Sequence, residues 1–234
     1  MRKPGRSKGP LCRLSGPRTK RSRAFFMPAN VTEWDERHRE AAQNRPSEPA
    51  SIVSEWLPLL PDGPALDLAC GTGRHTLLVA ERRHWVTAVD WSGTALDILE
   101  DRARKAKTHV SRANAAEMAA SRVRGIRLIQ ANLEEIQLPE SAFSLILCLQ
   151  YLQRSLFSRM ARALRPGGML LFETYTQAQL NYLGGPRNPA HLLEPRELRT
   201  AFPELHVLFY RELNAGQGIA SLVAERRQQK TSEK

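Results

Sequence analysis

The sequence predicts an α/β fold, with a mostly parallel sheet of seven strands between two layers of helices and a C-terminal antiparallel hairpin. From residue 65 onward, short apolar runs alternate with segments of helical periodicity, the pattern of parallel strands covered on both faces. The last two β-rich runs are separated by residues 214–218 only, and so short a link permits only an antiparallel pair. A chain of 234 residues is long enough to form one such domain with its own core.

The first two strands are predicted at residues 65–70 and 85–90. A turn cluster at 61–64 precedes the first strand, and an amphipathic helix is expected at 50–57. After the second strand, Ser92 can cap a helix in which apolar residues recur at helical spacing. Residues 107–124 are polar, basic and alanine-rich, and we expect a helical or loose insertion there.

The remaining strands are predicted at 126–131, 143–150, 169–175, 205–213 and 219–225. The run at 143–150 is almost continuously apolar, as a strand buried on both faces requires. A helix marked by Leu156 and Met160 should end at Arg165-Pro166-Gly167-Gly168, because proline cannot continue a helix and glycine tolerates the turn. Pro195 is placed to open a short helix.

Charge is concentrated at the N-terminus. The net charge is +11, but residues 1–23 hold nine Lys or Arg and no acid, which leaves 26 basic and 24 acidic residues in the rest of the chain. We therefore expect a disordered basic tail at 1–26 and a folded domain at 27–230. Three origins of the tail stay open: an arm for anionic partners, an organellar presequence, or sequence upstream of a true start at Met27.

Cysteine and histidine usage limits the chemistry. Cys12, Cys70 and Cys148 are far apart and form no C-x-x-C pair, so neither a disulfide framework nor a zinc site is expected. The histidines have no metal-ligand spacing, and His75 is expected to be a helix residue and not a base. No apolar run approaches the roughly 20 residues of a membrane span, so we expect a cytoplasmic protein of open oligomeric state.

The segment with the clearest chemistry runs from a strand through a glycine turn into a helix, Leu66 to Thr76 (L-D-L-A-C-G-T-G-R-H-T). Gly71 and Gly73 let the backbone turn sharply and let a ligand pack on it at the carboxyl edge of the sheet. Asp90 ends the second strand, where an acid can accept hydrogen bonds from both ribose hydroxyls of an adenosine cofactor.

This turn also fits a dinucleotide fingerprint whose third glycine is replaced by Thr76. The two cofactor classes differ in charge. A pyrophosphate favours a bare helix N-terminus, whereas a sulfonium cofactor is cationic and favours a nearby acid, which Asp67 can supply.

Leu66 to Thr76 is similar to motif I of class I S-adenosylmethionine-dependent methyltransferases, usually D/E-x-G-x-G-x-G. The run A-V-D-W-S around Asp90 resembles the family segment with the ribose-binding acid, and Arg165 to Gly168 before a strand resembles a further family mark. The resemblance covers residues 50–227. Within the family, W-D-E-R at 34–37, with Y-L-Q-R, E-T-Y-T and P-R-N-P, is most similar to bacterial tellurite-resistance-type methyltransferases.

The resemblance implies a Rossmann-like three-layer sandwich and a site for S-adenosyl-L-methionine. Two positions depart from the family pattern: Ala69 replaces its first glycine, and Asn132 replaces an acid that contacts the adenine amino group, although the amide oxygen can still accept that bond. Trp91 lies against the adenosine or simply packs. The residues expected to contact the cofactor are Asp67, Ala69, Cys70, Gly71, Thr72, Gly73, Asp90, Trp91, Asn132 and Leu133.

An acceptor is expected at the carboxyl ends of the fourth and fifth predicted strands. In-line methyl transfer depends mainly on alignment and needs a base only if the accepting atom carries a proton. Tyr182, Arg187 and Asn188 are expected to form a lid, and the acceptor would be anionic if Arg154 and Arg187 converge. The candidates for the substrate face are Gln150, Tyr151, Arg154, Glu173 and Tyr175.

The acceptor is expected to be a small molecule, because the chain has little room for a separate recognition domain. Three alternatives stay open. One is a nucleic-acid or protein methyltransferase aided by residues 1–23, and another is an NAD-dependent oxidoreductase, which the Arg165 to Gly168 turn and the hairpin disfavour. The third is a binding protein that keeps the fold without catalysis.

Overall fold

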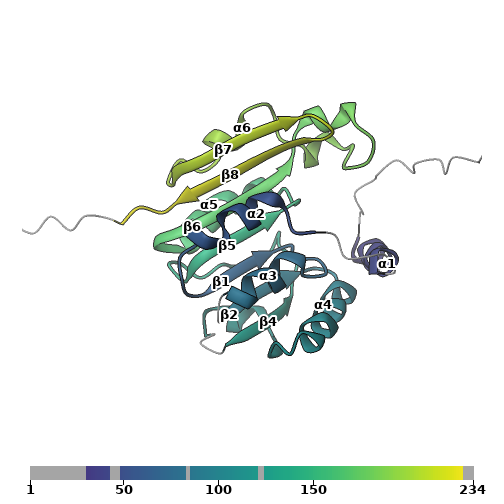
Figure 1. The fold of residues 1–234 in the computed structure, drawn as a ribbon, viewed down its shortest axis with the longest axis vertical. Helices are drawn as coiled ribbons and strands as arrows, with labels where there is room; N and C mark the ends of the chain where they lie inside the picture. The colour runs from purple at the N-terminus through teal and green to yellow at the C-terminus, as the bar shows by residue number, and fades with distance from the viewer. Residues whose placement is uncertain (1–29, 43–47, 83–84, 121–123, 229–234) are drawn as a thin grey trace, which may run out of the picture.

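The computed structural model describes residues 30–42, 48–82, 85–120 and 124–228, so the expected tail at 1–26 and Cys12 lie outside the described residues. Within these ranges, eight strands form one mixed sheet in the order β3-β4-β2-β1-β5-β6-β8-β7 (Figure 1). The strands are β1 (Ala65–Leu68), β2 (Trp85–Asp90), β3 (Val110–Ala113), β4 (Gly125–Gln130), β5 (Phe143–Leu149), β6 (Leu164–Tyr175), β7 (His206–Asn214) and β8 (Gly218–Glu225).

The sheet is parallel from β3 to β6, and β8 and β7 complete it as an antiparallel hairpin. The predicted fold class is confirmed, with one strand more than the seven expected. β3 lies in the segment expected to be a helical or loose insertion, and it pairs in parallel with β4 at the edge of the sheet. An edge strand with one covered face needs no continuous apolar run, which is why its polar sequence concealed it.

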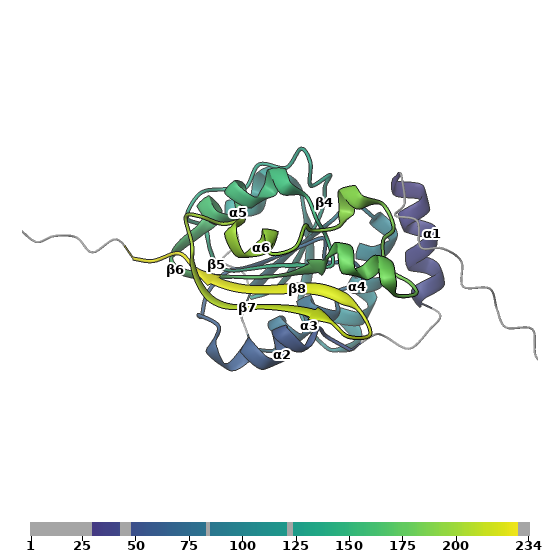
Figure 2. The same cartoon turned by 90° about the horizontal axis from the view of Figure 1, so that it is seen from above.

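Helices cover both faces of the sheet, as Figure 2 shows. On one face, α2 (Ser51–Trp56), α3 (Arg74–Arg82) and α4 (Gly93–Lys105) pack on β1, β2 and β4. On the other face, α5 (Phe157–Ala163) and α6 (Glu197–Thr200) pack on the largest apolar cluster of the described residues, which includes Phe172. The Ser92 hydroxyl accepts a hydrogen bond from Ala95 N at 3.0 Å, so the predicted cap of α4 is present.

One segment differs from the prediction. α5 ends at Ala163 as expected, but Arg165 to Gly168 belong to the irregular start of β6. A Cβ on Gly168 would lie 2.9 Å from the carbonyl oxygen of Phe143, so glycine permits this close pairing with β5. The short helix after Pro195 is a single turn, α6.

A further helix, α1 (Val31–Ala42), was not predicted. Asn30 and Glu33 cap its first turn reciprocally: Glu33 N donates to Asn30 Oδ1 and Asn30 Nδ2 donates to Glu33 Oε1, each at 3.0 Å. α1 lies beside α4, beyond the carboxyl ends of the parallel strands (Figures 1 and 2). It therefore stands at the edge where open α/β sheets bind ligands.

Short 3-10 turns complete the described chain. They are η1 (Leu57–Leu59), η2 (Ala115–Ala120), η3 (Arg154–Leu156), η4 (Gln177–Asn181) and η5 (Pro189–His191).

Candidate functional site

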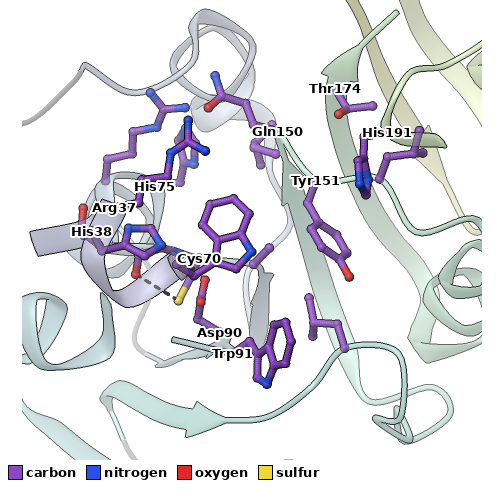
Figure 3. A pocket seen from close by; sticks show the side chains of 18 of the residues that line it. Arg37, His38, Cys70, His75, Asp90, Trp91, Gln150, Tyr151, Thr174 and His191 are labelled. Atoms are coloured by element: carbon purple, nitrogen blue, oxygen red, sulfur yellow. Dashed lines mark hydrogen bonds between the residues drawn. The ribbon is translucent and has the colours of Figure 1, made fainter. Parts of the chain in front are cut away.

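A cavity of about 370 Å³ lies where the strand order reverses, at the carboxyl ends of β1, β2, β5 and β6 (Figure 3). This is the size of a small-molecule pocket and the location expected in a doubly wound sheet. Its lining includes most of the residues predicted for the cofactor, namely Ala69, Cys70, Gly71, Thr72, Asp90, Trp91, Asn132 and Leu133.

The two glycines of the turn have different surroundings. Both have a positive φ, +54° for Gly71 and +81° for Gly73. A Cβ on Gly71 would meet only His38, with Cε1 at 3.5 Å, so Gly71 leaves space within the cavity. A Cβ on Gly73 would lie 2.1 Å from Leu99 Cδ1, so Gly73 permits the packing of the turn on α4 and does not line the cavity.

Asp90 fixes the turn against the end of β2. Its Oδ2 accepts a hydrogen bond from Gly71 N at 2.7 Å, and its Oδ1 accepts one from Ser92 N at 2.9 Å. Burial raises the pKa of Asp90, although the hydrogen bonds from Ser92 and Gly71 oppose that rise. The carboxylate keeps further lone pairs, and the residue lines the cavity.

Asp67 does not line the cavity, although it was predicted to face a cationic cofactor. It is 1% exposed behind the turn, where its Oδ2 accepts a hydrogen bond from Thr76 Oγ1 at 2.6 Å. Burial raises the pKa of Asp67 to about 7. Asp67 thus ties the first turn of α3 to β1, which is a supporting role.

Trp91 and Asn132 also line the cavity. Asn132 caps a tight turn, because its Oδ1 accepts a hydrogen bond from Glu134 N at 3.1 Å. An amide oxygen has a second lone pair, so this contact is compatible with a bond to a ligand. The Trp91 side chain is 37% exposed at the edge of the cavity (Figure 3).

Three of the five substrate-face candidates line the cavity: Gln150, Tyr151 and Tyr175. Gln150 has φ +59°, an uncommon conformation for a residue other than glycine, and it follows β5 directly. Burial raises the pKa of Tyr151 and of Tyr175, so both phenols stay protonated at neutral pH. They can donate hydrogen bonds but are poor bases.

Arg154 and Glu173 lie outside the cavity lining. Arg154 donates to Glu197 through Nε at 2.6 Å and through Nη2 at 2.8 Å, and its remaining bonds go to backbone carbonyls. Glu173 is buried between β6 and β8, where it accepts a bond from Ser221 Oγ at 2.6 Å. Both side chains hold elements together, so the prediction that they face the acceptor is corrected.

The predicted lid residues also lie outside the lining. Arg187 donates to the carbonyl oxygens of Leu180 and Tyr182, at 2.7 and 2.5 Å, and Asn188 caps η5. From this loop region, Pro186 and His191 line the cavity instead. An anionic acceptor was expected only if Arg154 and Arg187 converged, and neither residue lines the cavity.

Sequence reasoning missed the contribution of α1, which lines the cavity with Trp34, Arg37, His38 and Ala41. Trp34 and His38 are stacked, with ring centroids 5.7 Å apart, and the Arg37 guanidinium lies 5.4 Å from the Trp34 ring centroid. Burial lowers the pKa of His38, although the nearby Asp90 carboxylate opposes this. The capping pair at Asn30 and Glu33 and the spacing of these residues would have predicted the helix.

Two further residues of α3 line the cavity, Arg74 and His75. His75 Nε2 accepts a hydrogen bond from Ala50 N at 3.1 Å, and burial lowers the pKa of His75 to about 3. Its ring is therefore neutral at physiological pH, with one nitrogen committed to holding α2.

The polar groups that line the cavity fit S-adenosyl-L-methionine. A buried carboxylate for ribose, a turn without side-chain bulk at Gly71, and the Asn132 amide for an adenine edge all face one space. Among the described residues, no cluster of three or more His, Cys, Asp or Glu side chains is arranged to hold a metal ion, and no helix is long and apolar enough to span a membrane.

Residues 65–168, from β1 through the start of β6, match the family model of a methyltransferase domain. The resemblance to class I methyltransferases is thereby confirmed. A curated relative, malonyl-[acyl-carrier protein] O-methyltransferase from Herminiimonas arsenicoxydans, is 28% identical over 138 residues, which is 57% of this chain and 45% of that protein. The chain spans about half the length of the curated relatives it matches.

Solved structures share the fold. TehB from Haemophilus influenzae has a TM-score of 0.63 at 16% identity, over 80% of this chain and 65% of TehB. Geranyl diphosphate C-methyltransferase from Streptomyces coelicolor A3(2), solved with S-adenosyl-L-homocysteine, has a TM-score of 0.54 at 16% identity, over 75% of this chain and 77% of that one. At these identities the likeness shows the fold alone.

Proposed function

We propose that this protein is an S-adenosyl-L-methionine-dependent methyltransferase that acts on a small-molecule acceptor. The observation that carries the proposal is the buried Asp90 carboxylate, bound to the glycine turn and facing the cavity at the switch point of the sheet. The match of residues 65–168 to a methyltransferase domain supports it.

In this proposal Asp90 accepts hydrogen bonds from the ribose hydroxyls, and Asn132 accepts one from the adenine amino group. Gly71 and Ala69 border the methionine end of the cofactor. The bound cofactor supplies an electrophilic methyl group. Gln150, Tyr151 and Tyr175 then position the acceptor at the ends of β5 and β6. Because both phenols stay protonated, they orient the acceptor by hydrogen bonding, and alignment provides the main catalytic contribution.

Calorimetry with S-adenosylhomocysteine tests the cofactor. Asp90→Ala removes a charged hydrogen-bond acceptor, and two such bonds contribute about 3 kcal/mol, so affinity should fall roughly a hundredfold. Asp101→Ala, which changes an exposed acid on α4, is the matched control and should bind like the wild type. Thermal unfolding of each variant shows that the fold is kept.

Two outcomes would contradict the proposal. One is tight NAD binding without S-adenosylhomocysteine binding, which would indicate the oxidoreductase alternative. The other is unchanged affinity in Asp90→Ala, which would place the ribose elsewhere. A screen of small nucleophiles with radiolabelled methyl donor then identifies the acceptor.

A further inference from the structure

α1 contributes four side chains to the cavity, yet it contains no fully buried residue. A helix of 12 residues with no buried residue gains less from the hydrophobic effect than a buried helix, so specific polar contacts have a larger part in setting its position. The question is which contact sets the position of α1 over the cavity.

Asp35 provides such a contact. Its Oδ1 accepts a hydrogen bond from Ser92 Oγ at 2.5 Å and another from Thr94 N at 3.2 Å. Burial raises the pKa of Asp35, but the hydrogen bonds from Ser92 and Thr94 outweigh this and lower it. The carboxylate therefore stays ionised at neutral pH, at the N-terminus of α4, where the helix dipole favours negative charge.

The contact of Asp35 with Ser92 links α1 to the cavity, because Ser92 also binds Asp90. Ser92 is the N-cap of α4, and its backbone N–H also binds Asp90 Oδ1 at 2.9 Å. Asp35 thus binds the segment that positions the ribose-binding acid. Its neighbours on α1 along the helix, Trp34 and His38, face the cavity, and Figure 3 shows His38 beside Asp90.

We propose that Asp35 is a positioning residue: by binding Ser92 and Thr94 it fixes α1 at the N-terminus of α4 and so places Trp34, Arg37 and His38 around the cofactor. Its part in cofactor binding rests on the proposed function. Its part in fixing α1 does not, because these contacts join protein groups only.

Hydrogen–deuterium exchange of peptides within residues 31–42, measured without ligand, tests the first part. Asp35→Ala removes the acceptor and should speed exchange there at least severalfold, with no change in the strands. Asp35→Asn keeps an amide oxygen at the same place and should restore most of the protection. Glu36→Ala, an exposed acid on the same helix, is the control and should match the wild type.

Calorimetry with S-adenosylhomocysteine on the same variants tests the second part. We expect about tenfold weaker binding in Asp35→Ala and nearly wild-type binding in Asp35→Asn and Glu36→Ala. Wild-type exchange in Asp35→Ala would overturn the proposal, as would an equal loss of protection in Asp35→Asn. If the wild-type protein fails to bind S-adenosylhomocysteine, the proposed function fails, while the exchange result still decides what fixes α1.

Discussion

Ala69 departs from the methyltransferase motif that this segment resembles, and the departure has a structural cost. Its φ is +55°, in the left-handed region, where a residue with a Cβ is strained by roughly 1–2 kcal/mol. The methyltransferase motif that this segment resembles usually has glycine at this position, which tolerates a positive φ, whereas this chain has alanine. Ala69 is therefore a strained residue, and it lines the cavity.

Ala69→Gly should stabilise the protein. Relief of the left-handed strain outweighs the extra flexibility of glycine in the unfolded chain, which leaves a net gain of about 0.5–1 kcal/mol in the free energy of unfolding. Urea unfolding measures it. Ala106→Gly, at an ordinary φ of −79°, is the control and should not stabilise. A loss of stability in Ala69→Gly would show that the turn is unstrained.

Gly71 and Gly73 should respond differently to alanine. At Gly73 the added Cβ collides with Leu99 and meets a left-handed φ, so Gly73→Ala should lower the free energy of unfolding by about 2–4 kcal/mol. At Gly71 the added methyl has only an ordinary contact, so Gly71→Ala should cost about 1 kcal/mol but weaken S-adenosylhomocysteine binding. Chemical unfolding and calorimetry separate the two effects, and equal stability losses would contradict this division of roles.

At the scale of elements, the sequence predicted the buried strands and missed two elements that contain no buried residue, β3 and α1. β2 has its predicted bounds, and β5 differs by one residue, because continuous apolar runs mark strands covered on both faces. β3 and α1 contain no buried residue, so their sequences carry weak hydrophobic patterns. The predicted site therefore lacked the residues of α1, which line the cavity.

The contact between Arg154 and Glu197 joins η3 to α6 and replaces the predicted role of Arg154 at the acceptor. The pair is partly exposed, with Arg154 43% and Glu197 21% exposed in their side chains, so solvent screening limits its contribution. A double-mutant cycle with Arg154→Ala and Glu197→Ala should give a coupling free energy of about 0.5–1 kcal/mol in urea unfolding. A coupling near zero would show that the two side chains do not act together.

At the scale of the whole molecule, the sequence could not predict which residues from distant segments lie in the same cavity. Glycines, acids and strand ends are local features, so the turn and Asp90 could be placed correctly along the chain. Which arginines share a cavity depends on tertiary packing: Arg154 and Arg187 are occupied elsewhere, whereas Arg37 and Arg74, from distant segments, line the same space. Linear spacing carries no signal for such a pair.

Two buried titratable groups make the stability of the fold depend on pH in opposite directions. The pKa of Asp67 is raised to about 7, so the folded state retains a proton that the unfolded state loses above its ordinary value of 3.8. The stability from Asp67 is fully present below pH 3.8 and is lost as pH rises through 7. The pKa of His75 is lowered to about 3 from 6.5, so its contribution is fully present above pH 6.5 and is lost as pH falls toward 3.

Between about pH 4 and 6.5 the contributions of Asp67 and His75 to the free energy of unfolding change with pH in opposite directions. Replacing one of the two residues should therefore leave only the pH dependence of the other. Relative to the wild type, Asp67→Asn should make the free energy of unfolding rise more steeply with pH, because proton uptake by His75 in the unfolded state below pH 6.5 is no longer offset by the proton that folded Asp67 retains. His75→Gln should make it fall with increasing pH. Urea midpoints at pH 4.5, 5.5 and 6.5 measure both slopes; two variants that both follow the wild-type curve would mean that neither side chain is held in its neutral form by the fold.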